Sequence, residues 1–84
     1  MDRWISPLSQ REEEVGFLTA YGFSVEEISK KLFISSETVK HHRASIKKKL
    51  QCRSSFETGA RTILYLKSIK RLNNLIDEYK IDLK

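Results

Sequence analysis

Apolar and polar residues alternate along the chain at the spacing of helices that bury one face. Val25, Ile28 and Leu32 stand at positions i, i+3 and i+7 with mostly charged residues between them, which is the pattern of an amphipathic helix. A serine followed three residues later by a glutamate is the capping pair of a helix start. The chain contains three such pairs: Ser9 with Glu12, Ser24 with Glu27, and Ser54 with Glu57. We therefore predict helices that begin just after these serines.

A further helix is predicted over residues 36–50, directly after the one that Ser24 opens. Phe33 and Ile34 interrupt the helical period, and Ser35 follows as an N-cap whose hydroxyl can accept a hydrogen bond from the backbone near Thr38. Residues 24–46 are thus expected to form two short helices joined by a tight turn. This arrangement is a helix-turn-helix, a motif that recognises duplex DNA.

The helix at 36–50 is predicted to have two distinct faces, since successive residues are about 100° apart. The inward face carries Val39, His42, Ile46 and Leu50. The outward face carries Glu37, Lys40, His41, Ala44 and Lys48, with Arg43 and Lys47 on one flank and Thr38 and Lys49 on the other. The outward face is the one that we expect to be open to a partner.

Positive charge is concentrated on this same helix. Residues 37–53 contain six Lys or Arg against one acid, and the net charge of the whole chain is +5. Clustered Lys and Arg bind DNA phosphates, and a helix fits the major groove, where Lys40, His41 and Ala44 would meet base edges. A membrane surface would also attract the charge, but large apolar residues would then be expected on the other face. The remaining alternative is a charged face that only maintains solubility.

The first helix completes the predicted core. Val15 and Leu18 line one face of this helix, and Gly22 is placed to end it. The aromatic residues Phe17, Tyr21 and Phe23 are expected in the core, and Trp4 and Ile5 on the surface of the domain or of a partner. A chain of 84 residues allows only one small core, which oligomerisation often supplements.

The last helix is predicted to continue from Ser54 to Tyr79 or beyond, because no proline interrupts it. Its apolar residues follow the 3-4-3-4 spacing of coiled-coil seams, and Gly59 weakens its start. The candidate dimerisation residues are Tyr65, Ile69, Leu72, Ile76 and Tyr79, and Leu83 continues the spacing. We favour a dimer helix, either parallel or antiparallel. The alternative is that this stripe packs back on its own domain.

The run from Leu8 to Leu50 resembles the DNA-binding domain of LuxR-type (GerE-like) transcriptional regulators, and the resemblance continues more weakly to about Leu66. The matching motifs are LSxRExEV, GFSxEEI, KLFIS and TVKxHxxxIxxKL, in this order. The resemblance implies an all-α domain of four helices whose third helix enters the major groove. In this family the fourth helix often mediates dimerisation on an inverted repeat. The resemblance therefore implies this role for the long C-terminal helix of this chain.

The resemblance also assigns roles on the third helix. It implies base reading chiefly by Lys40, His41 and Ala44, to which the outward face adds Glu37 and Lys48. Contacts to the DNA backbone are expected from Ser35, Ser36, Thr38, Arg43, Lys47 and Lys49. Three positions depart from the family pattern. Gln51 stands where a glycine is usual, Cys52 where an aliphatic residue is usual, and Ala44 where some relatives have a longer polar side chain.

Other chemistry is poorly represented in the sequence. There is no glycine-rich phosphate loop and no set of nucleophile, base and orienting group, so we expect no enzyme and no cofactor. His41, His42 and Cys52 lack the converging geometry of a metal site, and no metal is expected. The sequence has no secretory signal and no membrane-spanning apolar run, and its lone cysteine cannot form an internal disulfide. A cytoplasmic protein without membrane contact is therefore expected.

We thus predict a DNA-binding domain over residues 1–66 and a helical extension for dimerisation over residues 67–84. The predicted function is a sequence-specific transcription regulator that binds double-stranded DNA as a homodimer. No sensor domain lies within these residues, so the chain is expected to be a stand-alone regulator or an excised output domain, and Met1 favours the former. One alternative is a module like sigma factor region 4, which docks on RNA polymerase. The other is an interaction protein that forms inactive mixed dimers with another regulator.

Overall fold

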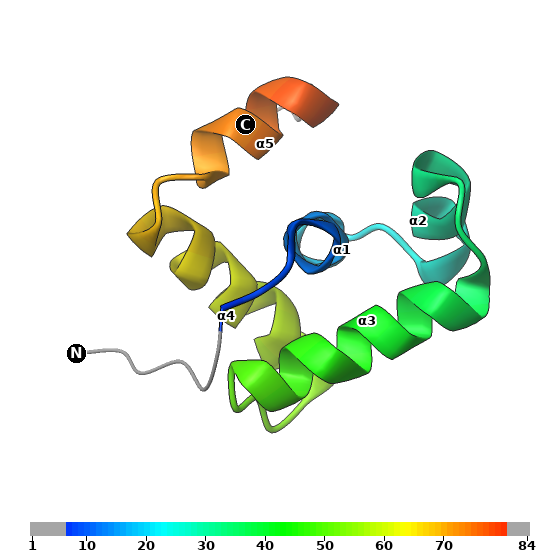
Figure 1. Ribbon diagram of the computed structural model, residues 1–84, viewed down its shortest axis with the longest axis horizontal. Helices are drawn as coiled ribbons and strands as arrows, with labels where there is room; N and C mark the ends of the chain where they lie inside the picture. The colour runs from blue at the N-terminus through cyan, green and yellow to red at the C-terminus, as the bar shows by residue number, and fades with distance from the viewer. Residues whose placement is uncertain (1–6, 81–84) are drawn as a thin grey trace.

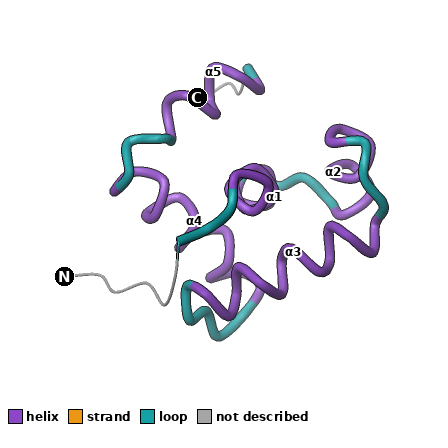
Figure 2. Tube along the Cα trace, in the orientation of Figure 1, coloured by secondary structure: helices purple, strands orange, loops and turns teal. Residues whose placement is uncertain are grey.

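The computed structural model describes residues 7–80, which form five helices and no strand (Figure 2). The helices are α1 (Gln10–Ala20), α2 (Val25–Leu32), α3 (Ser36–Lys49), α4 (Ser55–Ser68) and α5 (Leu72–Tyr79). The predicted all-α fold is confirmed, and none of these helices is long and apolar enough to cross a membrane. Trp4, Ile5 and Leu83 lie outside the described residues.

Serine caps open the first four helices at the predicted positions. Ser9 and Ser24 each form a complete capping box with the glutamate three residues later. The Ser35 hydroxyl accepts a hydrogen bond from the Thr38 N–H at 3.0 Å, and the Ser54 hydroxyl accepts one from the Glu57 N–H at 3.3 Å. These local bonds satisfy backbone donors that a helix start leaves unpaired, which is why the sequence alone located the starts.

Helix α1 lies at the centre of the domain, with the other four helices around it (Figure 1). Phe17 and Leu18 on α1 are fully buried, as are Ile28 on α2 and Ile46 on α3. Helix α4 approaches α1 very closely at Gly59, where a Cβ atom would lie 2.9 Å from the Cα of Ala20. The glycine that weakens the start of this helix is therefore needed for its packing.

The C-terminal part differs from the single long helix that the sequence predicted. Helix α4 ends at Ser68, Lys70 adopts a left-handed conformation with φ of 61°, and α5 folds back beside α1. Leu75 becomes fully buried by this bend. Burying a leucine contributes about 1.5–3 kcal/mol, which outweighs the cost of about 1–2 kcal/mol for a left-handed lysine. Tertiary burial thus overrides the helical pattern.

The candidate dimerisation residues consequently face their own domain. Tyr65 is 4% exposed and its hydroxyl accepts a hydrogen bond from the Leu8 N–H at 3.0 Å. Leu72, Ile76 and Tyr79 are partly buried against the core, and only Ile69 is exposed, at 40%. The single chain therefore shows the alternative arrangement, in which the stripe packs back on its own domain.

Candidate nucleic-acid interface

Helices α2 and α3 are joined by a turn of three residues, Phe33 to Ser35. Phe33 takes a left-handed conformation with φ of 58°, and the Ile34 N–H donates to the Ser29 carbonyl at 3.1 Å. Ile28 and Leu32 of α2 are buried together with Val39 of α3. This packing fixes the angle between the two helices, as a helix-turn-helix requires.

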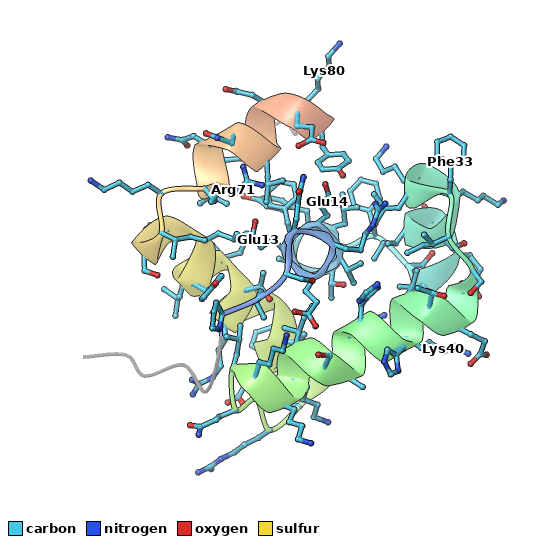
Figure 3. The ribbon with its side chains drawn as sticks, in the orientation of Figure 1. Glu13, Glu14, Phe33, Lys40, Arg71 and Lys80 are labelled. Atoms are coloured by element: carbon cyan, nitrogen blue, oxygen red, sulfur yellow. The ribbon has the colours of Figure 1, made fainter. Side chains whose placement is uncertain are left out.

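Helix α3 presents the predicted outward face to solvent. All five of its members, Glu37, Lys40, His41, Ala44 and Lys48, are exposed. On the opposite side Val39, Ile46 and Leu50 are fully buried, and His42 is half-buried. The Lys40 side chain extends away from the other helices (Figure 3). The division of α3 into two faces is as the spacing predicted.

The N-terminal half of this face forms a shallow, open depression. It is lined by Glu37, Thr38, Lys40 and His41. The Lys40 ammonium lies 3.8 Å from a Glu37 carboxylate oxygen, and both side chains are largely exposed. An exposed ion pair of this kind contributes little to stability. Lys40 and Glu37 can therefore separate and each bind a new partner. The depression therefore presents a donor and an acceptor at low energetic cost.

The candidate backbone-contact residues surround this face. Ser35 and Lys47 are exposed, whereas Ser36, Thr38 and Arg43 are half-buried. The hydroxyls of Ser35 and Thr38 lie 2.8 Å apart and are hydrogen-bonded to each other. The N-terminal turn of α3 therefore concentrates hydroxyl groups next to the positive end of the helix dipole, which favours anions.

Lys49 differs from the other basic residues of α3 because its ammonium lies on a buried carboxylate. It donates to Glu12 Oε1 at 2.8 Å, and the Ser45 hydroxyl donates to Glu12 Oε2 at 2.6 Å. Burial alone would raise the pKa of the Glu12 carboxyl, but the bonds from Lys49, Ser45 and the Ser9 N–H lower it to about 2. Lys49 thus fixes α3 to α1 rather than extending toward solvent.

His42 stands beside this cluster on the inward face. Burial lowers the pKa of its imidazole. The nearby Glu12 carboxylate has the opposite, smaller effect and raises this pKa. A neutral imidazole is therefore favoured, and it fits the half-buried position between charged groups. No group of three or more His, Cys, Asp or Glu residues in the described part of the chain is arranged to hold a metal ion.

The end of α3 shows how the chain manages without the usual glycine. Gln51 itself adopts the left-handed conformation, with φ of 57°. The Cys52 N–H donates to the Lys47 carbonyl at 2.8 Å and the Gln51 N–H to the Lys48 carbonyl at 3.3 Å, which together form a Schellman motif. The helix therefore ends as it would with glycine, although glutamine is strained there. Cys52 is half-buried, and burial raises the pKa of its thiol.

The family comparison agrees with this geometry. The model of bacterial regulatory proteins of the luxR family (GerE) matches residues 6–58, which is more than half of the chain. The chain belongs to the LuxR family of bacterial regulatory proteins. A search of curated proteins and one of solved structures gave no significant match. The LuxR-family match covers α1, α2 and α3 and the start of α4, and α5 lies beyond it.

The sequence did not indicate the link between Glu12 and α3 of this LuxR-family domain. The sequence pattern indicates Glu12 only as a capping residue. It indicates Lys49 as a basic residue on one flank of the helix and as a candidate contact to the DNA backbone. Ser45, which completes the cluster, is not among the site residues that the sequence predicts. A weak signal was present, because Ser45 and Lys49 are four residues apart and thus share one side of the helix.

Proposed function

We propose that this chain is a sequence-specific transcription regulator that binds an inverted repeat of duplex DNA as a homodimer. Membership of the LuxR family supports DNA binding and transcription regulation in general. The observation that carries the finer proposal is the exposed outward face of α3, with Lys40, His41 and Lys48 beside Glu37 and Ala44. Such a face can donate and accept hydrogen bonds in the major groove.

Each exposed side chain has a role that follows from its chemistry. Lys40 and Lys48 can donate to guanine acceptors, Glu37 can accept from a cytosine amine, and the Ala44 methyl can contact a thymine methyl. His41 can donate or accept, depending on its protonation. The groups for phosphate contact are Ser35, Ser36, Thr38, Arg43 and Lys47. We leave Lys49 out of this set because its ammonium lies on Glu12.

The homodimer is supported by the small footprint of one helix. A single recognition helix contacts only a few base pairs, whereas two helices one DNA turn apart read both halves of an inverted repeat. The described surface also carries exposed apolar residues on and just after α4, namely Phe56, Leu64 and Ile69. We further propose that the protein acts on duplex DNA in the cytoplasm, without catalysis of its own.

Selection of bound duplexes from a random DNA pool tests this proposal. Purified protein at moderate salt should enrich an inverted repeat whose half-sites are about one helical turn apart. Enrichment of a single half-site would contradict the dimer but not sequence-specific binding. Salt-sensitive binding without any enrichment would contradict specificity, and would favour polymerase docking or mixed dimers with another regulator.

A further inference from the structure

The connection between α4 and α5 is short and lacks the residues that usually end a helix. Neither proline nor glycine occurs between Ser68 and Leu72. Lys70 takes the left-handed conformation, with φ of 61°, which favours glycine over all other residues. The N-terminus of α5 has no side-chain cap. The local sequence therefore favours a continuous helix, and the bend depends on what α5 contacts.

Those contacts join α5 and its preceding residue to α1. Arg71 Nε lies 3.0 Å from Glu13 Oε1, and both side chains are mostly buried. Leu75 is fully buried in the core, and the Tyr79 ring centroid lies 6.0 Å from that of Phe17. Figure 3 shows Arg71 beside Glu13 on the side of α1 away from α3. We call this surface of α1, which includes Glu13 and Phe17, the α5-docking face.

None of these contacts requires that α5 and α1 belong to the same chain. If residues 69–71 become helical, α4 and α5 form one straight helix, and the spacing of Ile69, Leu72 and Ile76 continues through it as a stripe. The α5-docking face is then empty and can accept α5 of another copy. Ile69, which is exposed in the single chain, lies on this stripe.

We propose that two copies of this chain dimerise by exchanging α5, so that each α5 packs on the α5-docking face of the partner. Short, strained hinges favour exchange of this kind, and exchange builds a dimer from contacts that the monomer has already optimised. In the dimer the hinge becomes helical and the strain at Lys70 is released. This release offsets part of the entropic cost of association. This inference rests on the proposed homodimer and specifies how it forms.

Charge reversal across the Glu13–Arg71 pair distinguishes exchange from a closed chain. The variant Glu13→Arg has two arginines at this contact, and Arg71→Glu has two glutamates. These like charges meet both in the monomer of each variant and in its exchanged homodimer. In an exchanged heterodimer of the two variants, every contact joins opposite charges. Sedimentation should therefore show more dimer in the mixture than in either variant alone. The double variant Glu13→Arg with Arg71→Glu, which restores the pair within one chain, controls for folding.

Two substitutions at the hinge supply a second test. Lys70→Gly and Lys70→Ala both remove the lysine side chain, but glycine favours the bend and alanine favours the helix. The difference of about 1 kcal/mol between them in a helix corresponds to about fivefold per hinge. The dimerisation constant of Lys70→Ala should exceed that of Lys70→Gly by at least this factor.

The results separate this inference from the proposed homodimer. Equal dimerisation of the two Lys70 variants, with no gain on mixing the charge variants, would overturn exchange. If Leu64→Glu then dissociated the dimer, α4 would contact α4 directly and the homodimer would stand. A monomer for every variant, in free solution and on the selected DNA, would overturn both proposals.

Discussion

The ammonium of Lys49 on α3 donates to the buried carboxylate of Glu12 on α1 at 2.8 Å. Helix α3 is therefore held by an acid that lies outside the helix-turn-helix, with the Ser45 hydroxyl as a second donor. Glu12 also accepts from the Ser9 N–H at 2.8 Å. One side chain thus caps α1 and fixes the position of α3, so the orientation of the outward face of α3 depends on it.

Glu12→Gln should reduce the free energy of unfolding by about 2–3 kcal/mol at neutral pH, because it leaves a largely buried lysine without its counter-charge. The native pKa of Glu12 is about 2, whereas the unfolded value is about 4.3. Its stabilising contribution is therefore complete above about pH 5 and is lost as the pH falls toward 2. Urea unfolding between pH 7 and pH 2.5 should show the two proteins converging.

Glu26→Gln is the matched control for this experiment, because Glu26 is exposed on α2 and the substitution is chemically identical. It should change the free energy of unfolding by less than about 0.5 kcal/mol at any of these pH values. A constant difference between Glu12→Gln and the natural protein down to pH 2.5 would contradict the assigned role of the Glu12 charge.

Gln51→Gly should stabilise the protein by about 1 kcal/mol, because Gln51 holds φ at 57° and glycine adopts this conformation without steric cost. For a domain of this size, the melting temperature should rise by about 4–8 °C. Gln51→Ala removes the same side chain but keeps the Cβ atom, so it should give little gain. Equal melting temperatures for the glycine and alanine variants would show that the left-handed conformation is not strained.

The local parts of this fold were accessible from the sequence, because they depend on residues close in the chain. The caps at Ser9, Ser24, Ser35 and Ser54 and the exposed face around Lys40 follow from spacings of three or four residues. The bend at Lys70 does not, since no residue nearby requires it. Within one chain, the bend brings α5 back to the core, where Leu75 is fully buried. Long-range burial of this kind leaves no periodic signal.

The candidate site was predictable to a similar extent. Periodicity identified which side of α3 faces outward, and charge identified it as basic. The role of Lys49 was not predictable, because its partner Glu12 lies 37 residues away on another helix. From the sequence alone, a lysine that contacts phosphate and one that is paired within the fold look the same. Only the packing of α1 against α3 separates them.

Gly59→Ala should destabilise the domain although alanine is the better helix former. The added Cβ atom would lie 2.9 Å from the Cα of Ala20, and a backbone atom cannot move aside without shifting α1. Overpacking of this kind costs about 1–3 kcal/mol, against a gain of about 1 kcal/mol in helix propensity. Ala60→Gly at the exposed neighbouring position should lose only about 1 kcal/mol. Thermal unfolding of the variants measures both effects, and a stabilised Gly59→Ala would refute the close approach.

Lys40 and Lys47 should affect DNA binding in different ways, because one belongs to the outward face of α3 and the other to its flank. On the selected site, Lys40→Ala should cost about 1–3 kcal/mol of binding free energy and relax preference at one base pair. Lys47→Ala should weaken all duplexes alike and reduce the slope of log affinity against log salt by about one. Fluorescence anisotropy on the selected and on a scrambled duplex, at several salt concentrations, measures both quantities.

The control for these two substitutions is Lys80→Ala, which removes the same charge from the opposite side of the molecule. Figure 3 shows Lys80 at the end of α5, far from Lys40 on α3. If α3 faces the DNA, long-range attraction is largely screened at that distance, so Lys80→Ala should leave both affinity and salt slope nearly unchanged. Equal losses for Lys40→Ala on selected and scrambled DNA would reduce Lys40 to a phosphate contact. Equal losses for Lys80→Ala and Lys40→Ala would mean that the outward face of α3 is not the DNA-reading surface.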